Sequence, residues 1–223
     1  MKMEYNEKFQ QKFDSIAPIY EQISNAYTIA RRAELTTFLP NKVILEVGSG
    51  TGVVSELIDE NIICSDISFQ MCKQSVKKNR KNVICCDAEK LPIRENVLDV
   101  LISAEMIYYL NNVENFISCS HNCLKNNSEM SITMFNQKMK FVDKLRAFFR
   151  IFDKNQYFDD GQRNFLSIDI LKNILQKHQF EIISIEKRVI FPFNFLHKIN
   201  IILEKTFLNY FCYFITIHVK CVK

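Results

Sequence analysis

Three glycines at alternate positions, Gly48, Gly50 and Gly52, are the residues whose type and spacing point most clearly to chemistry. They follow the apolar run 43–47, and only one other glycine occurs in the 223 residues. Glycine permits positive φ and lets a ligand approach the backbone, because it carries no Cβ. A strand, this glycine turn and a helix beginning near Val53 would direct free backbone N–H groups at a bound ligand.

The glycine spacing separates the common nucleotide-binding loops. A dinucleotide site has the pattern G-x-G-x-x-G, and here Val53 stands where the third glycine is needed. A phosphate-binding loop requires a lysine after its second glycine, and none follows Gly52. Both interpretations are therefore weak, and a dinucleotide-dependent oxidoreductase remains only as a disfavoured alternative.

Carboxylates recur after the glycine loop at the ends of apolar runs. Asp66 lies 20 residues after Glu46, and Asp87 ends a further run, 83–86. An acid at about this spacing, at the end of a second strand, accepts hydrogen bonds from ribose hydroxyls in related α/β sites. Apolar runs separated by helical stretches predict a parallel sheet whose carboxyl ends line one crevice, where ligands bind.

The stretches 46–52, 66–71 and 87–92 together resemble those of class I S-adenosylmethionine-dependent methyltransferases, over about residues 5–135. Residues 13–21 also resemble the F-x-x-x-A-x-x-Y-[DE] segment of the methyltransferases that act on ubiquinone and menaquinone precursors and on the malonyl ester of biotin synthesis. The resemblance implies an α/β, three-layer, Rossmann-like fold. Its seven-stranded sheet would be mostly parallel, with an antiparallel last strand.

The same resemblance implies a set of residues that bind S-adenosylmethionine. The glycine loop would face the methionine part, Asp66 the ribose hydroxyls and Asp87 the adenine amino group. Tyr20 would reach the cofactor from an N-terminal lid. The full set implied by the resemblance is Tyr20, Glu46, Gly48, Ser49, Gly50, Gly52, Asp66, Ile67, Met71, Asp87, Ala88, Glu89 and Ser103.

Purely structural interpretations stand beside these roles. Asp66 or Asp87 could cap a helix. Met71 could be ordinary helix core, and Tyr20 could pack with Ile16 on an amphipathic helix. These alternatives stay open from the sequence.

No residue identifies itself as a catalytic base. Glu105, Tyr108 and Tyr109 follow the fourth predicted strand, where groups facing the acceptor would lie, and His121 is expected to face away. The [ND]-P-P-[YF] signature of nucleic-acid amino-methyltransferases is absent at residues 103–106. We therefore expect a small, apolar or aromatic acceptor that takes a methyl group by in-line displacement, and no nucleic acid. The alternative is a protein that binds S-adenosylmethionine as a sensor or inactive partner subunit. The acceptor atom, the pathway and the oligomeric state stay open.

One methyltransferase domain is expected over residues 1–223. It would comprise an N-terminal helical lid (1–40), a cofactor-binding core (41–135), a helical cap insertion (136–166) and a C-terminal helix and strands (167–223). Within the last part the pattern predicts a helix over 165–179 capped by Ser167, a strand over 180–185, a helix near 195–210 and a strand over 213–221.

The amino-acid composition restricts which other classes of protein the chain could belong to. The formal net charge of +4 is too small to indicate nucleic-acid binding by itself. The eight cysteines form no C-x-x-C pair, and Cys119 and Cys123 are expected in a helix rather than in a metal site. The start of the chain has no apolar signal segment, which favours the cytoplasm. The tail from Lys187 onward combines six lysines and arginines with six phenylalanines, a composition that could contact a membrane peripherally.

Overall fold

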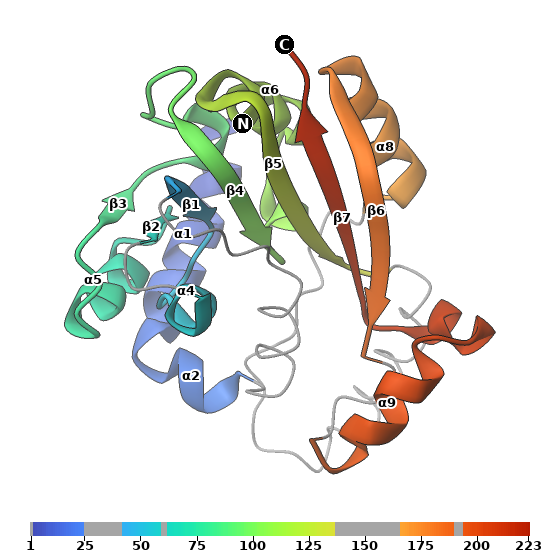
Figure 1. The fold of residues 1–223 in the computed structure, drawn as a ribbon. Coiled ribbons are helices and arrows are strands. Elements are labelled where there is room, and N and C mark those ends of the chain that lie inside the picture. The colour runs from blue at the N-terminus through green and yellow to red at the C-terminus, as the bar shows by residue number, and fades with distance from the viewer. Residues whose placement is uncertain (1, 25–41, 59–61, 137–165, 190–193) are drawn as a thin grey trace.

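A computed structural model describes residues 2–24, 42–58, 62–136, 166–189 and 194–223. Within them, seven strands form one sheet in the order β3-β2-β1-β4-β5-β7-β6 (Figure 1). The first five strands run parallel, and β7 pairs antiparallel with both of its neighbours. The predicted Rossmann-like, mostly parallel sheet with an antiparallel last strand is therefore confirmed.

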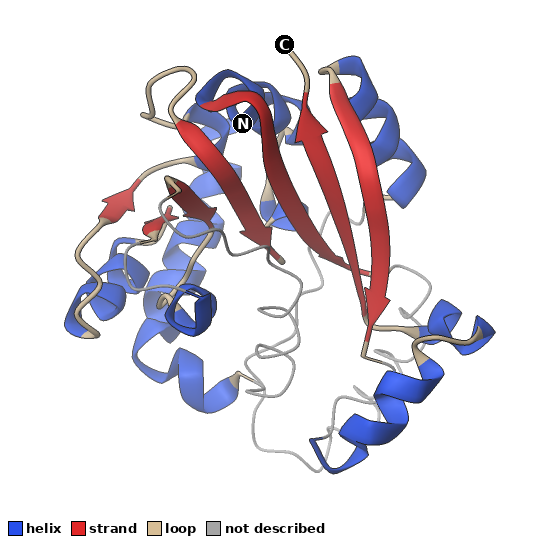
Figure 2. Ribbon diagram, viewed as in Figure 1, coloured by secondary structure: helices blue, strands red, loops and turns tan. Residues whose placement is uncertain are grey.

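The strands differ in length across the sheet. The short ones lie on the half that carries the glycine loop, and the long ones on the other half (Figure 2). Their bounds are β1 Ile44–Val47, β2 Ile63–Asp66, β3 Val83–Cys85, β4 Leu98–Ala104, β5 Leu124–Phe135, β6 Phe180–Arg188 and β7 Phe214–Cys221.

Helices and short 3-10 turns connect these strands. Their bounds are α1 Lys2–Ile16, η1 Ala17–Ile19, α2 Tyr20–Ile23, α4 Val53–Ile58, α5 Phe69–Lys77, η2 Ala88–Lys90, η3 Ile107–Tyr109, α6 Val113–Cys123, α8 Ile168–Lys177, η7 Asn194–Leu196, α9 His197–Leu203 and η8 Phe207–Phe211. Side-chain caps begin several helices: Ser68 accepts from Met71 N at the start of α5, and Ser167 accepts from Ile170 N at the start of α8.

The central strands are apolar because both of their faces are covered. Leu45, Leu101 and Ile102 are at most 1% exposed, as expected for parallel strands between helical layers. The main core joins β4, β5 and β7 to Phe116 of α6 and Leu171 of α8. This packed block holds the carboxyl ends of β1 and β4 in place, and the site is built on those ends.

The C-terminal elements match the predictions except in one place. The predicted helix over 165–179 and strand over 213–221 correspond to α8 and β7, and the strand predicted over 180–185 extends to Arg188 as β6. The single helix predicted near 195–210 is wrong. The chain forms η7, α9 and η8 instead, because the hydroxyl of Thr206 accepts the N–H of Leu208 and starts a new turn. Most of the predicted cap insertion, residues 137–165, lies outside the described residues.

Candidate active site

The glycine loop joins β1 to α4 and folds back onto β2. Gly48 and Ser49 both donate their backbone N–H to the carbonyl oxygen of Ser65, at 2.8 and 2.9 Å. Gly48, Gly50 and Gly52 have φ angles of +71°, +56° and +77°. This left-handed backbone costs other L-residues about 1–2 kcal/mol each, so glycine is needed at all three positions.

Two of these glycines also leave room for neighbouring side chains. A Cβ on Gly48 would lie 2.6 Å from Met106 Cβ, too close for any packed pair of carbons. A Cβ on Gly50 would lie 3.7 Å from Tyr20 Cε1, an ordinary contact distance. The loop therefore fits closely under Met106 at one end and forms a bare backbone wall opposite Tyr20 at the other.

Asp66, the last residue of β2, fastens the middle of the loop. Its Oδ2 accepts the N–H of Gly50 at 2.8 Å, and its Oδ1 accepts the N–H of Ser68 at 2.8 Å. Burial raises the pKa of Asp66 to about 6, although the N–H groups of Ser68 and Gly50 favour the charged form. The group is therefore mostly ionised at neutral pH but titrates just below it.

Asp87 follows β3 and connects the sheet to the N-terminal helix. Its Oδ1 accepts the N–H of Glu89 at 2.9 Å, which makes Asp87 the N-cap of η2. Its Oδ2 accepts a hydrogen bond from Asn6 Nδ2 of α1 at 3.0 Å. The capping interpretation holds for Asp87, and the same side chain also lines the pocket described below.

Helix α1 lies across the opening of this crevice. Asp14 Oδ1 accepts hydrogen bonds from Ser68 Oγ at 2.5 Å and from Gln70 N at 3.0 Å, so a side chain of α1 helps to cap α5. Phe9 and Phe13 of α1 both make edge-to-face contacts with Tyr109, at ring-centroid distances of 5.2 and 5.1 Å. Polar contacts near Asp14 and aromatic contacts near Phe9 thus hold the helix at two points.

The segment after β4 forms the wall opposite the loop. Glu105 adopts a φ of +60° and donates its N–H to Thr133 O of β5 at 2.8 Å. Positive φ in a residue other than glycine is uncommon and tends to occur at functional sites. The turn directs the following residues back over the sheet, where Tyr108 and Tyr109 lie 4.6 Å apart between ring centroids.

These elements enclose one pocket of about 960 Å³, including its open mouth. Its acidic side chains are Asp66, Asp87 and Glu105, and the described lining residues include no lysine, arginine or histidine. The described lining is Asn6, Phe9, Phe13, Tyr20, Val47, Gly48, Gly50, Asp66, Ile67, Met71, Cys86, Asp87, Ala88, Ala104, Glu105, Met106, Tyr108, Tyr109 and Leu110.

Eight of the thirteen residues expected to bind a cofactor line this pocket: Tyr20, Gly48, Gly50, Asp66, Ile67, Met71, Asp87 and Ala88. Met71 is 1% exposed and packs against Ile16, so it is both helix core and pocket wall. Tyr20 packs against the same small cluster from the start of α2.

Two of the remaining five residues turn their carboxylates away from the pocket. Glu46 is 1% exposed and accepts a hydrogen bond from the Ser55 hydroxyl of α4. Glu89 accepts the N–H groups of Asn111 and Asn112, at 2.7 and 2.9 Å, just before α6. The Glu46 carboxylate therefore connects the site to α4, and the Glu89 carboxylate connects it to the start of α6. Neither carboxylate lines the pocket.

The last three, Ser49, Gly52 and Ser103, lie behind the pocket wall. Ser103 pairs with Val47 across β4 and β1, which puts it beside the end of β1. The hydroxyls of Ser49 and Ser103 are buried and have no hydrogen-bond partner among the described residues. A Cβ on Gly52 would lie 2.8 Å from Ser75 Oγ, so Gly52 packs against α5.

Some lining residues could hardly be identified from the sequence. Asn6, Phe9 and Phe13 come from α1, and only the spacing of the two phenylalanines, four apart on one helix face, could have indicated a shared contact. Cys86 also lines the pocket, and burial raises the pKa of its thiol to about 11. The thiol is therefore protonated at neutral pH.

His121 and its neighbouring cysteines lie on α6, away from the pocket. The His121 ring nitrogen Nε2 is 3.2 Å from Val222 O, and its ring packs edge-on against Phe180. In the part of the chain that the structure describes, no three His, Cys, Asp or Glu side chains come together as a metal site.

Comparison with known proteins places this geometry in a family. Residues 45–132, which span the glycine loop, all three pocket carboxylates and the strands β1 to β4, match the family model described as a methyltransferase domain. Over these residues the chain matches a methyltransferase domain, and its fold is that of solved S-adenosylmethionine-dependent methyltransferases. The methyltransferase fold and the use of S-adenosylmethionine expected from the sequence are thereby confirmed.

Individual relatives of this methyltransferase are distant. A malonyl-[acyl-carrier protein] O-methyltransferase of Priestia megaterium is 24% identical over 78% of this chain and 69% of its own length. One of the same name from Herminiimonas arsenicoxydans is 28% identical over 44% of this chain and 37% of its own length. A crystal structure of an S-adenosylmethionine-dependent methyltransferase from Thermotoga maritima superposes with a TM-score of 0.72 at 16% identity, covering 95% of this chain and 99% of that one.

The pocket of this methyltransferase has the chemistry that its cofactor requires. The backbone wall at Gly50 carries no side chain, and the buried Ser49 hydroxyl has no partner among the described residues. Three carboxylates surround the space without a nearby basic lining residue in the described chain. S-adenosylmethionine carries positive charge at its sulfonium and amino groups, so an acidic pocket complements it.

Proposed function

We propose that this methyltransferase transfers a methyl group to a small, apolar or aromatic acceptor bound against Phe9, Phe13, Tyr108 and Tyr109. The observation that carries the proposal is this aromatic wall, in which Tyr109 contacts Phe9, Phe13 and Tyr108 at ring distances of 4.6–5.2 Å. Aromatic side chains of this kind bind planar or apolar molecules through their faces and edges.

The roles of the cofactor-binding residues form part of the proposal. Asp66 would accept the ribose hydroxyls with the lone pairs that its two backbone bonds leave available. Asp87 would accept the adenine amino group, and Ile67, Met71 and Ala88 would contact the adenosine between them. Gly48 and Gly50 would face the methionine part, and the buried hydroxyls of Ser49 and Ser103 would lie behind them in the wall. Tyr20 would close the pocket from α2.

Glu46, Gly52 and Glu89 would act indirectly. Glu46 fixes α4 through Ser55 and so fixes the far end of the glycine loop. Glu89 fixes the segment that leads from the aromatic wall into α6. Gly52 allows the loop to pack on Ser75.

When bound, S-adenosylmethionine supplies a methyl group activated by a sulfonium. The protein then has to align an acceptor atom in line with that methyl group and exclude water, which the α1 lid and the aromatic wall would do. Where the acceptor must lose a proton, Glu105 is the carboxylate in the wall after β4 that could receive it.

A carrier-protein-bound malonyl ester is the second candidate acceptor, because the curated relatives named above carry that activity in their names. Its free carboxylate is an anion. The described lining residues offer three carboxylates and no basic side chain to receive it. The described part of the pocket therefore favours the uncharged acceptor.

The experiment is a labelled-methyl transfer assay with two sets of acceptors. One set contains phenolic and quinone-precursor compounds, and the other contains malonyl-acyl carrier protein beside unmodified carrier protein. Transfer to the first set supports the proposal, and transfer confined to malonyl-acyl carrier protein replaces it with the second candidate. Binding of S-adenosylmethionine without turnover on either set or on a cell extract would instead favour the sensor.

A further inference from the structure

The segment from η7 to η8 buries two polar side chains, those of Asn200 and Glu204, and exposes six large apolar ones. Asn200 and Glu204, four residues apart, are 0% and 7% exposed and face the protein. Six of the twelve large apolar side chains exposed in the described chain lie within residues 195–211, which we call the α9–η8 surface: Phe195, Ile199, Ile202, Phe207, Tyr210 and Phe211. Phe195 and Phe207 are 83% and 85% exposed. A helix that only covered a core would have the opposite arrangement.

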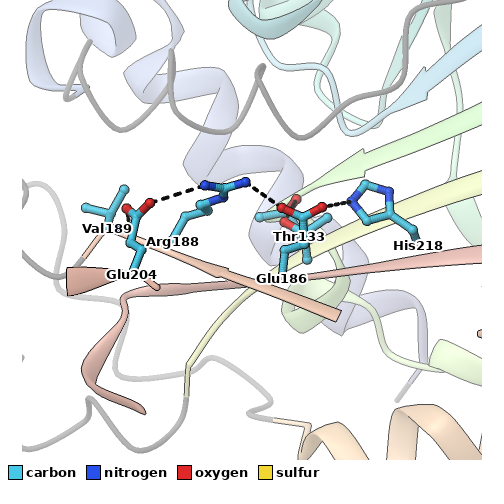
Figure 3. A network of polar contacts seen from close by, with 7 residues as sticks. Thr133, Glu186, Arg188, Val189, Glu204 and His218 are labelled. Carbon is cyan, nitrogen blue, oxygen red and sulfur yellow. Dashed lines mark hydrogen bonds and ion pairs between the residues drawn. The ribbon is translucent and has the colours of Figure 1, made fainter. Parts of the chain in front are cut away.

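A polar anchor holds this inverted helix in place (Figure 3). Glu204 Oε1 accepts the N–H of Val189 at 2.7 Å, and Glu204 Oε2 lies 3.3 Å from Arg188 Nη1. Arg188 also binds Glu186 at 2.6 Å, and Glu186 lies 3.9 Å from His218. Val189 has a φ of +64°, which is unfavourable for a β-branched residue and is held by the Glu204 hydrogen bond. The exposed apolar face is therefore presented by a fixed contact network.

The exposed charge on this surface is positive. Lys198 and Lys205 are exposed, whereas the one acidic residue between residues 194 and 211, Glu204, is buried and paired with Arg188. Exposed phenylalanines beside lysines are typical of segments that lie in the interface of an anionic membrane. A surface that is merely solvated would account for the exposed lysines but not for the exposed aromatic side chains. A purely apolar contact would account for the aromatic side chains but not for the lysines.

We infer that the α9–η8 surface docks on the surface of an anionic lipid membrane. Phe195 and Phe207 enter the interface, and Lys198 and Lys205 contact lipid phosphates. The contact is peripheral: none of the described helices is long and apolar enough to cross a bilayer.

The surface lies at the same edge of the sheet as the cofactor pocket. β6 and β7 pair Arg188 with Phe214 at the point where α9 and η8 branch off, and β5 ends beside them because Phe135 pairs with the same Phe214. Asn136 Nδ2, directly after β5, donates to Tyr210 O at 3.1 Å. In Figure 1 the α9 segment projects beyond the ends of β6 and β7. Docking would bring the carboxyl ends of the strands toward the lipid surface. The docking inference does not depend on the acceptor proposed above.

The test is sedimentation of the full chain with phosphatidylcholine vesicles, with and without phosphatidylglycerol. We expect binding only to the anionic vesicles and a decrease with salt. Phe207→Ser should lower the partition coefficient by about tenfold or more, since it removes the phenylalanine ring that would be buried in the interface. Lys198→Gln with Lys205→Gln should lower it about fivefold for each lysine.

Matched control variants distinguish binding through the α9–η8 surface from nonspecific binding to vesicles. Phe69→Ser removes a phenylalanine that is 58% exposed on α5, and Lys73→Gln with Lys81→Gln removes two exposed lysines elsewhere. Both controls should bind vesicles like the wild type.

Several results would overturn the inference. Equal losses in the controls, equal binding to neutral vesicles or no binding would each do so. A concentration-dependent dimer that Phe207→Ser dissociates would assign the surface to a second copy of the chain. A melting temperature that falls more in Phe207→Ser than in Phe69→Ser would show that the protein's own chain covers the surface.

Discussion

Replacing Gly48 by alanine should damage this protein more than the same change at Gly50, although both glycines have positive φ. The left-handed backbone costs alanine about 1–2 kcal/mol at either position. At Gly48 the new Cβ also meets Met106 Cβ at 2.6 Å, and overpacking of this kind adds about 1–3 kcal/mol. At Gly50 the nearest described atom is Tyr20 Cε1 at 3.7 Å, which needs no movement. The expected loss in the free energy of unfolding is therefore about 2–5 kcal/mol for Gly48→Ala and about 1–2 kcal/mol for Gly50→Ala.

Urea unfolding followed by circular dichroism measures both losses. A double-mutant cycle with Met106→Gly isolates the steric part, because removing the Met106 Cβ and Cγ relieves the clash but leaves the backbone strain at position 48. We expect a favourable coupling of about 1 kcal/mol or more between Gly48→Ala and Met106→Gly, and none between Gly50→Ala and Met106→Gly. Equal losses at the two glycines, or zero coupling at Gly48, would refute the close approach of Met106 to the loop.

Further predictions concern three charged groups of the site: Asp66, Glu105 and Asp14. Ribose hydroxyls would favour the ionised form of Asp66. The affinity for S-adenosylhomocysteine should therefore fall by up to about tenfold per pH unit below about pH 6. In calorimetry on Asp66→Asn, the affinity should not change with pH. Folding itself favours protonated Asp66, because burial raises its pKa from 3.8 to about 6. This contribution to the free energy of unfolding is present below pH 3.8 and is lost as the pH rises through 6. The urea midpoints of the wild type and Asp66→Asn should diverge between these two pH values. Glu105→Gln should lower kcat about 100-fold or more with an acceptor that must lose a proton, and an unchanged kcat would remove Glu105 from that role. Asp14→Ala should cost about 1 kcal/mol of stability by uncapping α5 and should raise KM for S-adenosylmethionine, whereas an unchanged KM would mean that α1 does not close the pocket.

The cofactor end of the fold could be predicted from sequence because backbone geometry restricts residue choice there. Positive φ requires glycine at 48, 50 and 52, and the carboxyl ends of parallel strands bring Asp66 and Asp87 to one edge. Alternation along residues 213–221 similarly predicted β7, and Ser167 marked the start of α8. In each case, a short stretch of sequence is compatible with only one favourable local backbone structure.

Other features depend on contacts between distant segments, which a single sequence does not display. Glu46 occupies the expected motif position, but its burial beside Ser55 decides that its carboxylate faces α4. Asn6 contacts Asp87 across 81 residues, and no periodicity in α1 could indicate that pair. The outward orientation of the apolar side of α9, within the predicted 195–210 helix, follows from the bonds of Glu204 to Val189 and Arg188.

Calorimetry of S-adenosylhomocysteine binding to the wild type and to Asp66→Ala tests most directly that this pocket holds the methyl donor. We predict saturable one-to-one binding to the wild type and an affinity about tenfold or more lower for Asp66→Ala, since hydrogen bonds to charged groups contribute about 1.5–3 kcal/mol. Circular dichroism of the variant must show a retained fold. An absence of binding to the wild type, or equal affinity in a folded Asp66→Ala variant, would contradict the account.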